Sequence, residues 1–163
     1  MASLADSPFA VLTVIAAPAI LTNASSVLAL GTGNRIARVV DRSRYLTAQL
    51  AGDELDELRR RVYREQLDGL QVRAQLLLRA LRWFYTSLAS FAAAALAAVV
   101  GSALSTVTGL RFIDVFAGIG LGVGTLGVTG LVTGCTLMVH ETRLAVCYLT
   151  EEAKLAAHDR SKG

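Results

Sequence analysis

The stretch VFAGIGLGVGTLGVTGLVTGCTLMV, Val115 to Val139, has no charged residue and exceeds the about 20 helical residues that cross a bilayer core. Two further blocks, near residues 9–30 and 83–104, have the same character. Inside a bilayer, backbone polar groups must be satisfied within the segment, so such blocks form helices. The sequence therefore predicts an all-α membrane protein with three transmembrane helices, at about residues 9–30, 83–104 and 113–139.

The composition supports a membrane protein over a soluble domain. Of the 163 residues 53% are hydrophobic and 18% are charged, with a mean hydropathy of +0.51. Eleven of the sixteen Lys and Arg residues lie between Arg35 and Arg82, so charged blocks alternate with uncharged ones. This alternation is typical of membrane proteins, and we expect the lipid bilayer, not a nucleic acid, as the main partner.

Basic residues are spread unevenly over the segments outside the three blocks. None precedes the first block, eleven lie between the first and second, one precedes the third, and four follow it. The positive-inside rule then places the N-terminus outside and the C-terminus in the cytoplasm. The initial MASLADSPF has no basic residue, so we expect a retained span rather than a cleaved signal peptide.

Two cytoplasmic helical segments are expected in the charged parts, at residues 34–82 and 140–158. The glycines of GTG, Gly31 to Gly33, predict a break after the first span, with Asn34 capping a new helix. A turn follows at Ala51 to Asp53. The next helix should continue into the second span, because no proline or turn cluster intervenes.

An apolar stripe with spacings of four and three marks that second helix. It consists of Tyr63, Leu67, Leu70, Ala74, Leu77 and Leu81. Such a stripe predicts packing of one helix face, either against helices of the same chain or in a coiled coil between chains.

The third block contains seven glycines in the seventeen positions from Gly118 to Gly134. Each weakens a helix by about 0.8–1.0 kcal/mol relative to Ala, so we expect a compensating gain from close helix packing. On a helix, one face collects Gly120, Gly124, Gly127, Gly130 and Gly134. Gly118 and Gly122 fall on the opposite face. The packing partner is either the Ala-rich second span or the same helix in another copy, which would make a homo-oligomer.

Motifs for catalysis or cofactor binding are weak. GVGTLG, Gly122 to Gly127, lies inside the third block and lacks the strand and turn of a nucleotide site. HETRL, His140 to Leu144, lacks the second histidine of a zinc helix. Cys135 and Cys147 have no zinc spacing. We expect no catalytic, cofactor or metal site, and no enzyme.

Polar residues within the first block are Asn23, Ser25 and Ser26. Intramembrane polar groups of this kind form hydrogen bonds between helices or line a pathway. We favour the structural interpretation, because no charge accompanies them.

The stretch NRIARVVDRSRYL, Asn34 to Leu46, is the main candidate site. On a helix Arg35, Arg38 and Arg42 share a face, and Asp41 can reach Arg38 and Arg44. One interpretation is an edge that contacts anionic lipid head groups. The other, which we favour, is an ordered polar joint in which Asp41 bridges arginines. The candidate residues are Asn34, Arg35, Arg38, Asp41, Arg42 and Arg44.

The longer stretch APAILTNASSVLALGTGNRIARVVDRSRYL, Ala17 to Leu46, resembles a family of small bacterial inner-membrane proteins known as domain of unknown function 2721. The pattern N-R-x-x-R-V-V-D-R-x-R carries the resemblance. It implies an inner-membrane location and the order span, Arg/Asp segment, cytoplasmic helix and two spans. It implies no activity.

Two functions of different classes are open at this point. The first is a self-associating structural, assembly or regulatory component of the membrane. The alternative is an oligomeric ion channel or small-solute transporter, with Asn23 and the glycine-rich helix lining the path and the arginines at its cytoplasmic mouth. The first is the one we favour.

Overall fold

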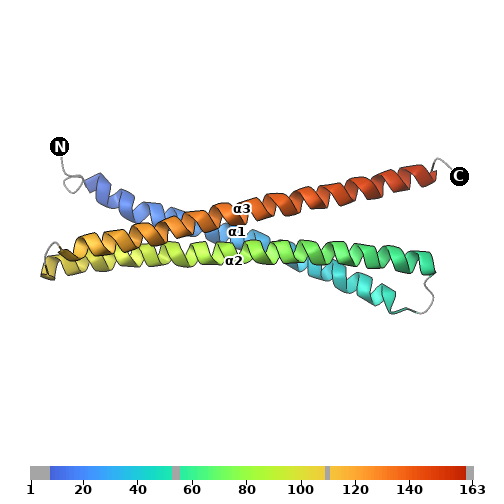
Figure 1. The fold of residues 1–163 in the computed structure, drawn as a ribbon, viewed down its shortest axis with the longest axis horizontal. Coiled ribbons are helices and arrows are strands. Elements are labelled where there is room, and N and C mark those ends of the chain that lie inside the picture. Colours follow the sequence, from blue (N-terminus) through green and yellow to red (C-terminus); the bar gives the residue numbers. More distant parts are fainter. Residues whose placement is uncertain (1–7, 53–55, 109–110, 161–163) are drawn as a thin grey trace. The chain divides into compact units, whose positions relative to one another are not determined.

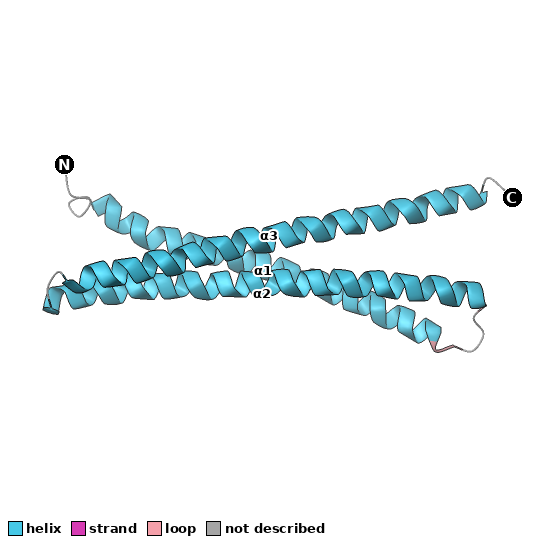
Figure 2. Ribbon diagram, viewed as in Figure 1, coloured by secondary structure: helices cyan, strands magenta, loops and turns pink. Residues whose placement is uncertain are grey.

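The computed structural model describes residues 8–52, 56–108 and 111–160, with side chains described for 16–52, 56–104 and 115–146. Within these ranges the chain forms three α-helices, α1 (Pro8–Leu50), α2 (Glu57–Thr108) and α3 (Arg111–Arg160) (Figure 1). All regular structure in the described residues is helical (Figure 2). The all-α prediction is confirmed.

Two of the helices are long and apolar enough to cross a membrane. The candidate spans are Glu57–Leu104 in α2 and Val115–Val146 in α3, each with a window of mean hydropathy 1.9. Only 28% and 11% of those windows are buried within the chain. A soluble core helix would be mostly buried, so this exposure is compatible with a membrane location. Spanning by residues 9–30 of α1 stays a prediction.

The predicted break at Gly31 to Gly33 is wrong, because α1 is one helix from Pro8 to Leu50. Thr32, between the two glycines, is fully buried, and its hydroxyl donates to Met138 Sδ at 3.5 Å. Helix propagation is cooperative, and two glycines cost only about 1 kcal/mol each. The buried contact of Thr32 with Met138 offsets this cost, and the helix stays intact. Asn34 is therefore an exposed residue inside a helix and not a cap.

The end of α1 agrees with the predicted turn where it is described. The Ala51 amide donates to the Thr47 carbonyl, and the Gly52 amide donates to the Gln49 carbonyl, both at 3.2 Å. Asp53 lies outside the described residues. Beyond the turn, α2 runs from Glu57 to Thr108 without a break between its charged and apolar parts.

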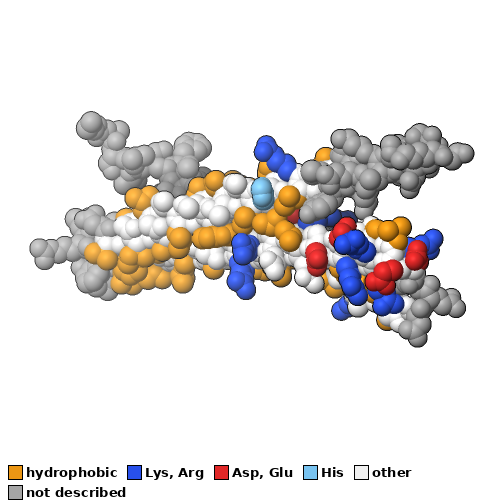
Figure 3. Space-filling view, turned by 45° about the vertical axis from the view of Figure 1, so that its right-hand side comes forward, with side chains coloured by type: hydrophobic (Ala, Val, Ile, Leu, Met, Phe, Trp, Pro, Cys, Tyr) orange, Lys and Arg blue, Asp and Glu red, His pale blue; other side chains and the backbone are white. Residues whose placement is uncertain are grey.

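Each helix contributes to two compact units. Unit 1 comprises Met1–Gly31 and Arg82–Gly134, and unit 2 comprises Thr32–Leu81 and Cys135–Gly163. On the face shown in Figure 3, most of the charged side chains gather over unit 2, and the visible part of unit 1 shows hydrophobic side chains among uncharged ones and backbone. The two units thus correspond to the apolar and charged blocks of the sequence.

Buried positions recur with a heptad spacing. In α1 the buried residues of unit 2 are Thr32, Val39 and Leu46. In α2 a series of buried positions alternates spacings of three and four: Leu77, Ala80, Phe84, Ser87, Phe91 and Ala94; Ser90 is buried in addition to this series. This period of seven is the packing geometry of left-handed helical coils. Leu77 is fully buried within one chain, so packing inside the chain accounts for this part of the predicted stripe.

In unit 1, glycines of α3 meet large side chains of α2. A Cβ atom at Gly127 would lie 2.7 Å from Phe91 Cε1, and one at Gly134 would lie 2.6 Å from Phe84 Cε1. At Gly130 a Cβ would lie 2.6 Å from Ser87 Oγ. The rings of Phe91 and Phe84 therefore occupy the space that a side chain at position 127 or 134 would need.

The other glycines of α3 are less tightly packed. A Cβ at Gly120 would lie 3.9 Å from the Ala94 carbonyl oxygen, and one at Gly124 would meet nothing within 4 Å. Gly118 and Gly122 also have nothing within 4 Å. Among the glycines of α3, close approach to α2 thus occurs at Gly127, Gly130 and Gly134, and it does not extend to Gly124.

Candidate functional site

A buried carboxylate lies at the centre of unit 2. The side chain of Glu141, on α3, is 2% exposed and is held by arginines from both other helices. Arg73 of α2 donates from Nε to Oε1 at 2.9 Å, and its Nη2 forms an ion pair with the same oxygen at 2.8 Å. Arg35 of α1 reaches Oε2 through Nη1 at 3.5 Å. Each carboxylate oxygen is therefore occupied from a different helix.

The heptad of α3 explains why a carboxylate is buried here. Glu141 follows Gly134 by seven residues, and Gly134 follows Gly127 by seven, so all three belong to the same buried stripe. A buried carboxylate is costly unless it is paired and hydrogen-bonded. The Arg35 and Arg73 side chains, 43% and 30% exposed, provide this pairing while part of each side chain stays in contact with solvent.

A second contact ties α1 to α3 at the same place. Arg35 Nη1 also donates to the Thr142 hydroxyl at 3.2 Å, and this hydroxyl donates to the Met138 carbonyl at 2.9 Å. Arg35 is thus shared between Glu141 and Thr142. Arg73 has the shorter contacts and is the principal partner of the carboxylate.

The expected role of Asp41 is corrected by this geometry. Asp41 is exposed and forms no ion pair with any residue that the structure describes. It follows the buried Val39 by two residues, or roughly 200° around the helix, so it lies away from the packed face. The anion that bridges the arginines is Glu141.

Arg73 and Glu141 were missed by the sequence reasoning. Two signals in the sequence point to them. Glu141 continues the seven-residue spacing of Gly120, Gly127 and Gly134, and Arg73 lies three residues after Leu70 of the apolar stripe. A carboxylate and an arginine at such positions are close to helix interfaces, although the spacing does not say which partners they find.

A pocket of about 320 Å³ lies beside Glu141 in unit 2. Its lining residues come from all three helices: Arg35, Arg38, Val39, Arg42, Leu70, Arg73 and Glu141. Three of the six candidate residues, Arg35, Arg38 and Arg42, thus share a pocket, whereas the other three do not line it. The guanidinium of Arg42 also lies 5.5 Å from the centre of the Tyr45 ring.

The polar residues of the first block do not form a shared network among the described side chains. Ser25 is fully buried, and its hydroxyl has no hydrogen-bond partner. The Ser26 hydroxyl donates to the Thr22 carbonyl at 3.0 Å, along its own helix. Asn23 is exposed.

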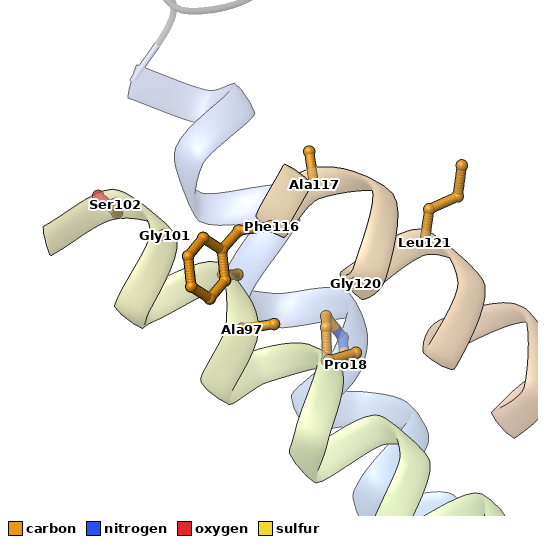
Figure 4. Close-up of a pocket in the computed structure, with 10 residues that line it drawn as sticks. Pro18, Ala97, Gly101, Ser102, Phe116, Ala117, Gly120 and Leu121 are labelled. Atoms are coloured by element: carbon orange, nitrogen blue, oxygen red, sulfur yellow. The ribbon is translucent and has the colours of Figure 1, made fainter. Parts of the chain in front are cut away.

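A second pocket, of about 580 Å³, lies in unit 1 (Figure 4). No charged residue lines it, and the Phe116 ring lies beside Gly101, where a Cβ would be 2.8 Å from Phe116 Cβ. Its lining residues are Pro18, Ala94, Ala97, Ala98, Gly101, Ser102, Phe116, Ala117, Gly120 and Leu121. This lining can hold an apolar group but offers no acid or base.

The described side chains meet few of the requirements of a metal site or of a reactive thiol. None of them forms a group of three or more His, Cys, Asp or Glu residues that could hold a metal ion. Cys135 is a free, half-buried thiol, and the side chain of Cys147 lies outside the described residues. The expectation that the protein is not an enzyme stays a prediction.

The fold and site define a class of protein: an all-helical chain in which two helices are suited to cross a membrane, with a buried glutamate held by arginines in its charged unit. A family model described as "Protein of unknown function (DUF2721)" matches residues 15–150, and the chain belongs to this family. The matched region contains Arg35, Arg73 and Glu141. No curated protein and no solved structure matches the chain. The resemblance carried by Ala17 to Leu46 is confirmed.

Proposed function

We propose that this protein is a structural, assembly or regulatory component of the bacterial inner membrane, with three spans, an outer N-terminus and a cytoplasmic C-terminus. Two apolar helices that stay largely unburied within the chain support a membrane location. The distribution of basic residues supports the orientation.

The observation that carries the proposal is the pairing of Glu141 with Arg35 and Arg73. Burial of one carboxylate between arginines of two other helices makes α1, α2 and α3 depend on one another in unit 2. A buried polar contact of this kind adds little stability over an apolar one, but it fixes which residues face each other. A rigid joint suits a component that positions other parts of an assembly.

Self-association is supported by the surface that α3 leaves uncovered. Gly118 and Gly122 are exposed, four residues apart, and have nothing within 4 Å. Leu121 beside them is 74% exposed. Small residues at this spacing let two helices approach closely in a bilayer, so we propose that a second copy of the chain packs here.

The alternative function, an oligomeric channel or small-solute transporter, draws support from Ser25. Its buried hydroxyl forms no hydrogen bond with a described residue, and a buried polar group without a partner needs an explanation, which a role in conduction would give. Flux into vesicles that contain the purified protein distinguishes the two functions. The structural component produces no flux above that of empty vesicles, and a channel or transporter does.

The membrane arrangement is tested with single cysteines in a chain whose two native cysteines are replaced. A thiol reagent that cannot cross the inner membrane should label cysteine at position 3 or 108, outside the described side chains, and spare cysteine at Ala51. Labelling at Ala51 contradicts the orientation. Self-association is tested by the mass of the detergent-solubilised particle, and a monomer mass contradicts it.

A further inference from the structure

We infer that the pocket beside Glu141 binds a phosphate group. Four arginines and one glutamate line it, so the lining has a formal charge of +3. All of these residues belong to unit 2. An excess of fixed positive charge in a concave site attracts an anion, and no described acidic side chain other than Glu141 lines the pocket.

The arginines differ in how far they are already engaged. Arg73 is held at one carboxylate oxygen by two short contacts. Arg35 has a longer contact of 3.5 Å with the other oxygen. Arg38 and Arg42 form no ion pair with a residue that the structure describes. A ligand therefore meets two unpaired guanidinium groups, with Arg35 able to turn towards it.

The ion pair between Arg73 and Glu141 fixes the orientation of one arginine of the pocket. Because Nε of Arg73 donates to a buried carboxylate oxygen and Nη2 lies 2.8 Å from the same oxygen, the guanidinium is held in place before any ligand arrives. Pre-ordering of a rotamer-rich side chain removes part of the entropy cost of binding. The buried glutamate thus supports the pocket instead of neutralising it.

Phosphate fits the charge and shape of this lining better than a carboxylate. A phosphate monoester carries close to two negative charges and several acceptor oxygens, and the planar guanidinium binds phosphate oxygens in pairs. The pocket volume of about 320 Å³ lies near the lower end of the about 300–1,000 Å³ that small-molecule sites span. Val39 and Leu70 add apolar surface to the lining, which suits carbon attached to the phosphate.

Two sources could supply this chemistry, the head group of a phosphate-bearing lipid or a soluble phosphate compound. The inference deepens the proposed function, because such a ligand would give the joint at Glu141 a regulatory input. It is tested by binding alone, so its failure is distinct from a failure of the topology or mass measurements above.

The soluble arm uses purified full-length protein in a neutral detergent. The thermal midpoint of unfolding is measured against rising inorganic phosphate or glycerol 3-phosphate, with chloride added to constant ionic strength. A ligand of the folded state raises the midpoint in a saturable way. The test variant is Arg38→Gln/Arg42→Gln, which removes two charges at the pocket. The control is Arg59→Gln/Arg61→Gln, which removes two charges at exposed positions of α2 that do not line it.

The lipid arm reconstitutes the same three proteins in vesicles of phosphatidylcholine with phosphatidic acid, or with phosphatidylglycerol at matched surface charge. Native mass spectrometry after extraction counts the anionic lipid that each protein retains. Phosphatidic acid presents a phosphate monoester and phosphatidylglycerol a diester. Preferential retention of phosphatidic acid by the parent and the control, but not by the test variant, assigns the phosphate to a lipid head group.

The expected result is saturable binding by the parent in at least one arm, weakened at least tenfold by Arg38→Gln/Arg42→Gln and less than twofold by the control. If the test variant does not fold, Arg38→Lys/Arg42→Lys decides by the same criterion, because lysine keeps the charge but loses the planar fork. Equal weakening by the test and control variants overturns the inference, since it indicates a diffuse surface charge. Absence of saturable binding by the parent in both arms also overturns it.

Discussion

Arg73 places two donors, Nε and Nη2, on a single oxygen of Glu141, and the Glu141 side chain is 2% exposed. The two partners are 68 residues apart in the sequence and come from different helices. The carboxylate is buried and the arginine is 30% exposed. Removal of Arg73 therefore leaves a buried charge, whereas removal of the carboxylate leaves an arginine that water can reach.

Removal of Arg73 should destabilise the protein more than removal of the Glu141 charge. Arg73→Leu leaves a buried carboxylate with only the longer contact to Arg35, and breaking a buried pair in this way costs about 3–5 kcal/mol. Glu141→Gln leaves arginines that water can solvate, with an expected cost of about 1–3 kcal/mol. Denaturant unfolding of the purified variants measures both, and a larger loss for Glu141→Gln contradicts this order.

Removal of Asp41 should leave stability unchanged. Asp41 is exposed and unpaired among the described residues, and substitutions at such sites usually change stability by no more than about 0.5 kcal/mol. This reverses the expectation from the sequence, in which Asp41 was the anion that bridges the arginines. A loss of more than about 1 kcal/mol for Asp41→Ala in the same unfolding measurement would restore that earlier role.

Among the glycines of α3, a large side chain should disturb the packing inside the chain at Gly134 and not at Gly122. Gly134→Leu collides with the Phe84 ring, and overpacking of this kind costs about 1–3 kcal/mol. Gly122→Leu meets nothing within 4 Å in its own chain, so the packing inside the chain should be preserved, and its cost should fall on association with a second copy.

For Gly124→Leu, the structure and the glycine pattern of the sequence predict different effects on stability. The pattern places Gly124 on the packed face with Gly134, whereas the structure leaves it without a neighbour within 4 Å. Thermal midpoints of the three variants in one detergent provide the comparison. Equal loss at positions 124 and 134 contradicts the packing described for unit 1.

Phe84 and Gly134 should be energetically coupled. Phe84 is fully buried, and its ring takes the space beside Gly134. Gly134→Ala should be harmful with Phe84 present and tolerated when Phe84→Leu makes room for the methyl group. Contacting residues typically show coupling of about 0.5–3 kcal/mol in a double-mutant cycle. Additive changes in unfolding free energy, within about 0.3 kcal/mol, would show that the ring does not define the space at Gly134.

Local sequence features predicted the helices and much of their periodicity. The uncharged blocks, the turn near Ala51 and the stripe through Leu77 are all set by residues close together in the chain. The break at Gly31 to Gly33 was predicted wrongly, because the contact that keeps this helix intact joins Thr32 to Met138, 106 residues away. The helix propensities of the local residues carry no information about a contact with such a distant residue.

The candidate site shows the same limit. The shared face of Arg35, Arg38 and Arg42 follows from helix geometry, and all three line one pocket. The sequence interpretation assigned the anion to Asp41, because helix geometry places it within reach of Arg38 and Arg44. In the structure the anion that pairs with the arginines is Glu141, which lies on the buried stripe of α3 seven residues after Gly134. Pairing across helices depends on the register between them, and a single sequence does not contain that register explicitly.

The central claim, that Glu141 and Arg73 form a buried pair joining α2 to α3, is tested most directly by a double-mutant cycle. Glu141→Leu leaves Arg73 and Arg35 without their anion, and Arg73→Leu leaves Glu141 with only the longer contact to Arg35, while the double variant replaces the pair by apolar side chains. Replacement of a whole buried pair is often neutral, so the double variant should be more stable than Arg73→Leu alone. The predicted coupling in unfolding free energy is about 2 kcal/mol or more. Single-variant losses that simply add in the double variant would contradict the pairing.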